Sequence, residues 1–461
     1  MYLCRVGKEK KSFICSNCGA QSTRWEGRCV SCGQWNTLEE ITIQEETKTE
    51  KKRNPWSSLE RNHKASELIQ EVQTLEEDRL KSSSKELDRV LGGGLVKGSL
   101  VLLGGQPGIG KSTLLLQMAL RFGRSLLYVS GEESAAQIKM RADRIGIRNQ
   151  ECYIFTETNL KKIFKEVKTK DPACVVIDSI QTLMSPDVDS MAGSVSQLKE
   201  CAGEIQFFAK EHNIPFFIIG HITKEGSIAG PKLLEHVVDV VLHFEGDQNY
   251  SYRILRSLKN RFGSTDEIGI YEMMETGLRE VTNPSELLIQ QHDSRLSGSC
   301  IGAAVEGKQP LLVEIQALVG TAVYGSPQRS TTGFDNRRLN MLLAVLEKRC
   351  GLVIANHDVF LNVAGGIKIQ DPAMDLPTVC AILSSMHDIP IEQTICFAGE
   401  IGLSGEVRSV SRIEQRIQEA ERLGFEQIFM STHNLKSLKS NYNIQIKDLK
   451  TVADLLHELF V

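Results

Sequence analysis

The chain has 461 residues, enough for about three domains of ordinary size, each with its own apolar core. Its 54 Lys and Arg against 58 Asp and Glu give a net charge of −4, so nucleic-acid binding, if present, must be local. The longest apolar runs, such as "IPFFIIG", are too short to span a membrane, and the amino terminus lacks the apolar core of a signal peptide. We expect a cytoplasmic protein with no membrane partner and with reduced cysteines.

Four cysteines near the amino terminus form two CxxCG halves, with ten residues between Cys18 and Cys29: Cys15, Cys18, Cys29 and Cys32. Each half turns tightly enough for both thiolates to reach one ion, and two halves complete a tetrahedral Zn²⁺ site. A redox dithiol is the main alternative, although it needs only one CxxC and usually occurs in a βαβ context. We predict a structural zinc ribbon over residues 1–38, folded by its metal, and a flexible charged linker over 39–78.

An apolar run over residues 100–103 leads through glycines into a predicted helix, and residues 105–112 fit the pattern GxxxxGK[ST]. In such a phosphate loop, backbone N–H groups surround phosphate oxygens, the lysine reaches the β- and γ-phosphates, and the serine hydroxyl holds Mg²⁺. We therefore expect ATP and Mg²⁺ as cofactors. The residues predicted to bind the nucleotide are Gly105, Gln106, Pro107, Gly108, Ile109, Gly110, Lys111, Ser112 and Thr113.

Three further predicted strands end on side chains suited to nucleotide chemistry. "ACVVIDS" places Asp178 at the carboxyl end of a buried strand, where it would hold Mg²⁺ together with Ser112. "YVSGEES" ends on Glu132 and Glu133. We predict that Glu132 is the base that activates water, the alternative being that one of the pair caps the next helix. "PFFIIGH" ends on His221, which is either a γ-phosphate sensor or an ordinary core histidine.

"KNRFG", residues 259–263, sets Lys259 and Arg261 two residues apart. In an extended strand, residues i and i+2 project from the same face, so both cations would point at one place, as expected for the binding of an anion. The alternative is an edge strand whose charges resist unwanted pairing.

The segment "LDRVLGGGLVKGSLVLLGGQPGIGKSTLLLQ", the glutamate after "YVSGE", the "VVIDS" strand, "KNRFG" and the amino-terminal cysteines together resemble the bacterial RadA (Sms) family of DNA repair proteins. The resemblance spans essentially the whole chain. It implies an α/β fold with a RecA-like P-loop ATPase domain over residues 79–282. It also implies a homo-oligomer, a hexameric ring, in which Lys259 and Arg261 of one subunit complete the next subunit's nucleotide site, as in motors related to the DnaB helicase.

The resemblance further implies activity on single-stranded or branched DNA in recombinational repair, with a RecA-type recombinase as partner. The loop after His221 carries Lys224 and Lys232 with glycines between them. Such a loop is usually only a surface turn, but its position matches a DNA-binding channel loop of RecA-like rings, and we predict that both lysines contact DNA phosphates. "SPDVDSMAGSVSQLKE", after the Asp178 strand, is a second candidate channel loop.

The last third, residues 283–461, is predicted to be an α+β domain, and its sequence resembles the proteolytic domain of Lon. Leu339, Leu342, Leu343 and Leu346 form one helical stripe, which is typical of a core-facing helix that Gly351 ends. The domain is expected to serve as an assembly platform. Arg408, Arg412 and Arg416 are candidates for a basic DNA-binding face, with ordinary solvated charge as the alternative.

In the Lon family a serine nucleophile is activated by a lysine. Alignment by eye puts Met374 in the place of the serine and Glu414 in the place of the lysine, and neither side chain can perform that chemistry. Ser384 and Ser385 lie nearby within a predicted helix, where a hydroxyl usually bonds its own backbone. We therefore expect no proteolysis.

Two functions remain open from the sequence. One is a DNA-dependent ATPase acting as a ring-shaped motor that promotes branch migration. The other is a nucleotide-gated clamp or scaffold that loads recombination partners without moving along DNA. Sustained DNA-stimulated turnover with directional unwinding would favour the motor.

Overall fold

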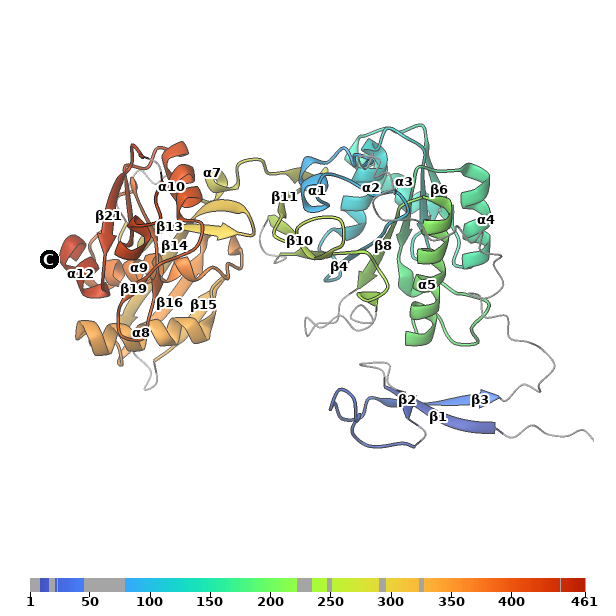
Figure 1. The fold of residues 1–461 in the computed structure, drawn as a ribbon, viewed down its shortest axis with the longest axis horizontal. Helices are drawn as coiled ribbons and strands as arrows, with labels where there is room; N and C mark the ends of the chain where they lie inside the picture. Colours follow the sequence, from blue (N-terminus) through green and yellow to red (C-terminus); the bar gives the residue numbers. More distant parts are fainter. Residues whose placement is uncertain are drawn as a thin grey trace, which may run out of the picture.

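The computed structural model describes residues 9–15, 21–22, 24–44, 79–221, 234–246, 251–289, 296–322, 327–439 and 441–460. These residues build a small antiparallel sheet, a nine-stranded sheet and a seven-stranded sheet, in that order along the chain (Figure 1). The two large sheets carry helices, as the predicted α/β class requires. In the described part of the chain, no helix has the length and apolarity needed to cross a membrane.

The amino-terminal sheet has the strand order β2-β1-β3. Its strands are β1 (Glu9–Cys15), β2 (Gln21–Ser22) and β3 (Leu38–Gln44). Cys15 pairs with Leu38 at one end of the β1–β3 ladder, and both side chains are buried. Among the described residues of this unit, Cys15, Cys29 and Leu38 form the buried apolar cluster, with Phe13 and Cys32 partly buried against it. A cluster of this size needs a further stabilising element.

The nine-stranded sheet has the order β12-β11-β10-β9-β4-β8-β7-β5-β6, in which β8 separates the phosphate-loop strand from the Asp178 strand. Strands β9, β4, β8, β7, β5 and β6 are parallel neighbours, and most are buried on both faces, which explains their continuous apolar runs. The parallel strands are β4 (Leu100–Gly105), β5 (Leu126–Ser130), β6 (Cys152–Thr156), β7 (Cys174–Asp178), β8 (Phe216–His221) and β9 (Val240–Glu245). The antiparallel extension comprises β10 (Tyr252–Asn260), β11 (Ile268–Met274) and β12 (Gly277–Glu280).

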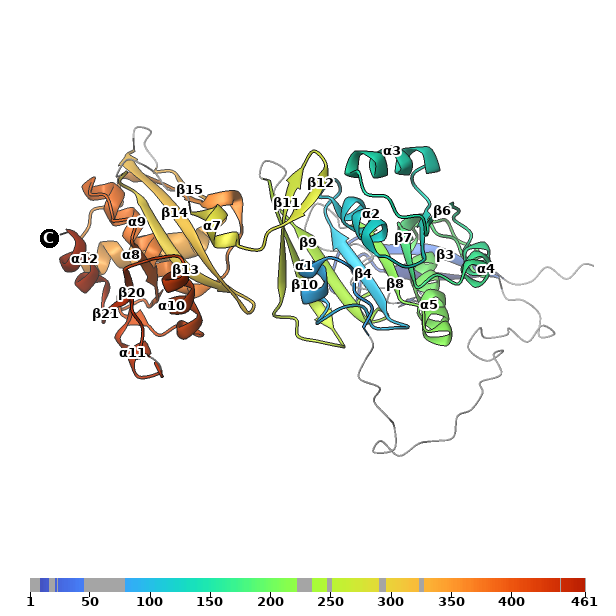
Figure 2. The ribbon, with the colours of Figure 1, turned by 90° about the horizontal axis from the view of Figure 1, so that it is seen from above.

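Helices cover both faces of this sheet (Figure 2). One apolar cluster joins α1 (Lys85–Val90), α2 (Lys111–Arg121) and α3 (Ala135–Ile145) to one face. A second cluster joins α4 (Leu160–Lys170), the 3₁₀ turn η1 (Ile180–Thr182) and α5 (Val195–His212) to the other. Side chains cap these helices by accepting backbone hydrogen bonds, which fixes where each helix begins. The capping residues of α1, α3, α4 and α5 are Ser84, Ser134, Asn159 and Ser194.

The carboxyl-terminal sheet has the order β15-β16-β14-β13-β17-β20-β21, beside a two-stranded β18-β19 ribbon. Its strands are β13 (Ser299–Glu306), β14 (Gln309–Thr321), β15 (Arg329–Thr332), β16 (His357–Val363), β17 (Ile395–Ala398), β18 (Glu400–Ile401), β19 (Val407–Arg408), β20 (Gln427–Ser431) and β21 (Gln445–Leu449). Its helical segments are α7 (Pro284–Leu288), α8 (Asn336–Cys350), η2 (Ala364–Gly366), η3 (Pro372–Met374), α9 (Asp375–His387), α10 (Ile413–Arg422), α11 (Thr432–Leu435) and α12 (Val452–Phe460).

Helix α8 confirms the predicted leucine stripe. The four leucines at positions 339, 342, 343 and 346 are buried in one cluster with residues of α9 and α12. Asp335 caps the amino end, and Gly351 ends the helix at φ +71°, a left-handed conformation that glycine adopts readily. The stripe therefore serves the core of this domain.

Candidate active site

The phosphate loop lies between β4 and α2, as the motif requires. Gly108 and Gly110 have φ values of +77° and +113°, which favour glycine. A Cβ atom on Gly110 would lie 2.7 Å from Cε of Met273, so the end of that side chain would have to move to make room for it. The resulting turn aims the amino-terminal N–H groups of α2 along the loop, the geometry that binds phosphate.

Lys111 is buried at the first position of α2. Its Nζ donates to the carbonyl oxygens of Gly105, at 2.8 Å, and Gln106, at 2.9 Å. Burial lowers the pKa of Lys111 to about 8, and the negative charges of Asp178 and Glu132 oppose this lowering. Bound phosphate would offer the amine stronger, charged acceptors than these two carbonyls.

Asp178 ends β7 and is buried, with its Oδ2 accepting a 2.7 Å hydrogen bond from the Tyr128 hydroxyl. The neighbouring strand β5 ends level with β7, because Ser130 pairs with Asp178. The Ser179 hydroxyl donates to Oε1 of Glu132. The structure thus brings Lys111, Glu132 and Asp178 together at the carboxyl edge of the parallel sheet, where ligands bind in open α/β folds.

Sequence reasoning missed Tyr128 and Ser179. Burial, reinforced by the charge of Asp178, raises the pKa of Tyr128 well above its usual value, so the phenol stays a donor to that carboxylate. Two signals were available. Ser179 directly follows Asp178, and Tyr128 lies two residues before the end of the adjacent strand, on the same face as Ser130.

Neither Glu132 nor Glu133 caps α3. Ser134 does so, in a capping box with Gln137, which overturns the alternative interpretation of the glutamate pair. Glu133 instead forms an ion pair with Arg141 on the same helix. An open hollow of about 290 Å³ lies in front of Glu132, lined by Ser130, Gly131, Glu132, Glu133, Thr156, Glu157 and Thr158.

Lys259 and Arg261 lie together, although only Lys259 is within β10 and Arg261 follows its end. Their charges interact with each other, and both side chains lie near Asp239. Lys259 Nζ donates to Glu235 O, at 2.6 Å, and Val238 O, at 2.8 Å. Burial and the charge of Arg261 both lower the pKa of Lys259. Strand β10 pairs with β11 over residues 252–256 and with β9 over residues 254–260, so it is not an edge strand of the sheet, although Lys259 lies beyond the ladder with β11.

Arg261 is half exposed and lies 3.4 Å from Oδ1 of Asp239, whose own side chain is 3% exposed. Oδ2 of Asp239 accepts from the Leu100 backbone N–H, at 3.1 Å, which fixes this carboxylate at the start of β4. The Arg261 guanidinium therefore rests on an anchored anion and still has a free face toward solvent.

The predicted DNA-binding residues Lys224 and Lys232 lie outside the described residues, and so does Cys18. His221 ends β8 level with Gly105, and its side chain is likewise outside the description. The second candidate DNA loop, residues 185–200, contains Asp187 and Asp189, and its one cation, Lys199, lies exposed within α5. The Gln197 side chain holds this loop through hydrogen bonds to Ser185, Val188 and Ser190. The part of the segment before α5, residues 185–194, contains no Lys or Arg that could contact phosphate.

The cysteine cluster has the geometry of a metal site. The Sγ atoms of Cys15, Cys29 and Cys32 all lie within 4.8 Å of one another. Cys15 and Cys32 are 3.6 Å apart, close to the edge of about 3.8 Å expected for a tetrahedron with 2.3 Å Zn–S bonds. These thiolates would hold Zn²⁺ in a site without an open position if Cys18 supplies the fourth ligand.

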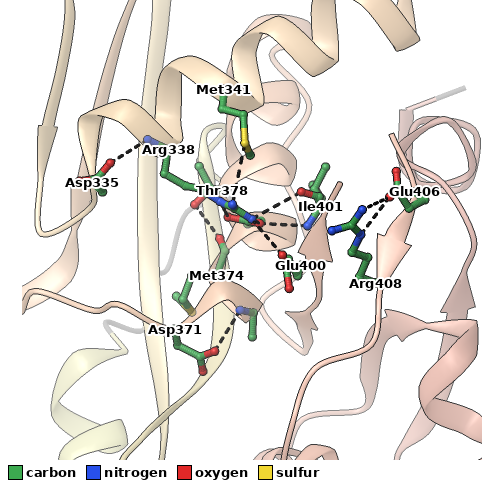
Figure 3. Close-up of polar contacts among 12 residues, drawn as sticks. Asp335, Arg338, Met341, Asp371, Met374, Thr378, Glu400, Ile401, Glu406 and Arg408 are labelled. Carbon is green, nitrogen blue, oxygen red and sulfur yellow. Dashed lines mark hydrogen bonds and ion pairs between the residues drawn. The ribbon is translucent and has the colours of Figure 1, made fainter. Parts of the chain in front are cut away.

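Met374 is buried where the Lon-like alignment expects a nucleophile. Its carbonyl accepts from the Thr378 hydroxyl, at 2.7 Å, and Arg338 lies 3.7 Å from Glu400 in the same region (Figure 3). Ser384 and Ser385 are in α9, as expected. Their hydroxyls do not bond the preceding turn, however. Ser384 Oγ donates to Ile389 O and accepts from Gly298 N, so it has a structural role. Glu414 accepts from Lys439 N, at 2.8 Å.

The proposed basic face does not form as expected. Arg416 is buried, and its NH1 lies 2.6 Å from both Ala303 O and Asp371 Oδ2, so it can neither reach DNA nor count as solvated charge. Arg408 forms an ion pair with Glu406, at 2.6 Å, and Arg412 with Asp266, at 3.2 Å. The regular spacing of these arginines along the chain does not distinguish a buried arginine from an exposed one.

Known families match three parts of the chain. One described as "Rubredoxin metal binding domain" matches residues 13–40, one described as "AAA domain" matches residues 65–227, and one described as "Subunit ChlI of Mg-chelatase" matches residues 308–434. Two solved structures each match 44% of this chain. One is a KaiC-like protein from Pyrococcus horikoshii, of which 99% is covered, with 19% sequence identity and a TM-score of 0.37. Another is the RadB recombinase, covered to 99% at 23% identity and a TM-score of 0.35.

The phosphate loop, the acidic strand ends and the parallel sheet define a P-loop ATPase of the RecA-like class, flanked by a cysteine ribbon and a Lon-like domain. The relatives of this chain are more specific. DNA repair protein RadA of Bacillus subtilis is 48% identical over 98% of this chain and 99% of its own length. The RadA proteins of Listeria monocytogenes and Streptococcus pyogenes are 46% and 45% identical, over 97% and 99% of this chain and 98% and 100% of theirs. This chain therefore belongs to the RadA family of DNA repair proteins.

Proposed function

We propose that this chain is a DNA-dependent ATPase that works in DNA repair and recombination as a ring of identical subunits on single-stranded or branched DNA. In this ring, Lys259 and Arg261 of one subunit complete the ATP site of the next. Membership of the RadA family and the ATPase site support the activity, and the position of the two cations supports the shared site.

The observation that carries the shared site is the strand register. Gly105 of the phosphate loop pairs with Phe244 on β9, whereas Asn260, between the two cations, pairs with Val240 at the other end of β9. Four residues of strand separate the two levels by about 13 Å. Lys259 and Arg261 therefore lie near the amino-terminal end of β9, whereas their own phosphate loop lies near its carboxyl-terminal end. An ATP held by a neighbouring subunit is the anion that they would reach.

The residues of the site suggest a division of labour. The phosphate loop and Lys111 would bind the phosphates, and Ser112 and Asp178 would hold Mg²⁺, which neutralises phosphate charge when bound. Glu132, fixed by Ser179, would orient and deprotonate the attacking water. Arg261 would stabilise the charge that develops on the transferred phosphoryl group, a contribution of about 10³ to 10⁵ in rate for fingers supplied in trans.

DNA contact in this proposal rests on Lys224 and Lys232, because phosphate contacts need cations and carry little sequence preference. Partnership with a RecA-type recombinase and promotion of branch migration follow from the family resemblance. Directional unwinding coupled to sustained turnover would distinguish this motor from a clamp that loads partners without moving.

The carboxyl-terminal domain is proposed to be proteolytically inactive. Met374 offers a thioether, which is no acyl acceptor, and the Ser384 hydroxyl is already engaged by two backbone partners in a buried position. ATP-dependent digestion of casein by the purified protein would contradict this assignment.

The shared site is tested by mixing two variants. Lys111→Ala should disable the pocket and Arg261→Ala the finger, so each protein alone should lack ATPase activity. In mixed rings some interfaces pair an intact pocket with an intact finger, and partial recovery of ATP turnover is expected. If no activity returns while the mixture still forms oligomers, action in trans is refuted.

A further inference from the structure

The turn between β13 and β14, residues 306–309, contacts the loop that follows the two cations. Lys308 N donates to Asp266 O, at 2.8 Å, and Lys308 Nζ lies 3.2 Å from Oε1 of Glu267. Gly307 has a φ of +62°, and a Cβ atom there would lie 1.6 Å from Asp266 O. The turn of the carboxyl-terminal domain is thus pressed directly against the backbone of this loop.

The same turn holds β10 itself. Arg256 lies three residues before Lys259, and its NH1 is 2.7 Å from Oε2 of Glu306. Glu306 is buried, and its other oxygen accepts from Gln370 N, at 3.1 Å. Arg256 also lies 3.3 Å from Glu245 on β9. The Arg256 side chain therefore links strand β10 both to the carboxyl-terminal domain and to the neighbouring strand β9.

The KNRFG segment also packs against the beginning of its own ATPase domain. Arg79 NH2 donates to Phe262 O, at 2.7 Å. A Cβ atom on Gly92 would lie 3.2 Å from Cα of Gly263, so two backbones meet here without side chains between them. Arg89, in helix α1 of the ATPase domain, contacts the turn of residues 306–309 as well, because its NH2 donates to Oε1 of Gln309, at 2.9 Å.

We propose that residues 306–309 position the Lys259–Arg261 segment of the same subunit, so that the carboxyl-terminal domain sets how well each subunit completes its neighbour's ATP site. Residues on both sides of the segment contact this turn: Arg256, three residues before Lys259, and Asp266, five residues after Arg261. A shift of the turn would move the cations without touching the subunit's own phosphate loop. This inference rests on the proposed shared site.

Gly307→Ala tests the inference, with Gly351→Ala as its matched control. Both changes place an alanine at a left-handed backbone position in the same domain. A Cβ on Gly351, however, meets nothing within 4 Å in the described part of the chain, whereas one on Gly307 must displace Asp266. We expect Gly307→Ala to lower kcat for ATP by about 10- to 100-fold while the affinity for a fluorescent ATP analogue stays unchanged. Gly351→Ala should retain the wild-type kcat.

Mixing identifies which half of the interface is damaged. Lys111→Ala mixed with Gly307→Ala should regain turnover, because the first protein supplies an intact segment to the second protein's intact pocket. Arg261→Ala mixed with Gly307→Ala should not, because neither supplies a competent segment. Recovery in the second mixture would overturn the inference, since the defect would then lie in the pocket.

A milder variant guards against a folding defect. Glu306→Gln keeps the shape of the side chain and removes the charge that pairs with Arg256, and it should also lower kcat without changing nucleotide affinity. If Gly307→Ala and Glu306→Gln both turn over ATP like the wild type while Arg261→Ala is inactive, positioning by residues 306–309 is refuted and the shared site stands. If Arg261→Ala keeps full turnover, the shared site fails and the positioning inference fails with it.

Discussion

Arg416 and Asp371 form an ion pair inside the carboxyl-terminal domain, with 2.6 Å between NH1 and Oδ2 and both side chains almost shielded from solvent. Oδ2 of Asp371 also accepts from Val305 N, and Arg416 NH1 donates to Ala303 O. The pair therefore ties α10 to β13 at the core of the sheet. Its contribution is structural, although spacing alone had suggested a DNA-binding arginine.

Arg416→Ala should destabilise the domain by about 3 to 5 kcal/mol, because it leaves the Asp371 carboxylate buried without a counter-charge. Denaturant unfolding of the purified protein measures this change. Arg408→Ala, which removes an exposed arginine paired with Glu406, should unfold at the wild-type midpoint and serves as the control. Equal midpoints for the two variants would contradict the assigned role of Arg416.

Glu132→Gln should lower kcat for ATP hydrolysis by about 10² to 10⁴, the range typical of a lost general base, and leave ATP binding intact. Glu133→Gln is the matched control, since Glu133 is the next residue but is engaged by Arg141. Its kcat should stay close to that of the wild type. Steady-state turnover and nucleotide binding of both variants make the comparison, and a larger loss for Glu133→Gln would reverse the assignment.

Nucleotide affinity should fall as the pH rises from 7 to 9. Lys111 has a pKa of about 8 without nucleotide, so its ammonium is progressively lost through this range. Because phosphate binds the charged form, the apparent affinity should weaken by up to about tenfold at pH 9. Calorimetry at pH 8.5 in two buffers of different ionisation enthalpy should register proton uptake on binding. Binding without proton uptake and without pH dependence would refute this account of Lys111.

Cys15→Ser or Cys32→Ser should release zinc from the ribbon and expose residues 13–40 to protease, because the buried cluster described in this unit contains two cysteines and Leu38 and depends on the metal. Cys152→Ser, in strand β6 of the ATPase sheet, should retain the metal. Zinc content per chain and limited proteolysis provide the measurements. A Cys15→Ser protein that keeps its full complement of zinc would show that the metal binds elsewhere.

Local chemistry decided much of this site before any fold was known. The glycines of the phosphate loop, Lys111, and the acids that end apolar runs are recognisable because their functions depend on residue type and on position relative to a strand or helix end. The leucine stripe of α8 was equally predictable, since helical periodicity is a property of neighbouring residues. The same logic assigned Cys15, Cys29 and Cys32 to one cluster.

Tertiary structure decided which distant groups meet. Only the strand order shows that Lys259 and Arg261 lie at the far edge of the sheet from their own phosphate loop, because residues far apart along the chain are aligned by register. Burial likewise separated Arg416 from Arg408, which spacing had treated alike. The sequence by itself determined the chemical groups available to this protein. Long-range packing, which no local pattern encodes, determined their neighbours and therefore their roles.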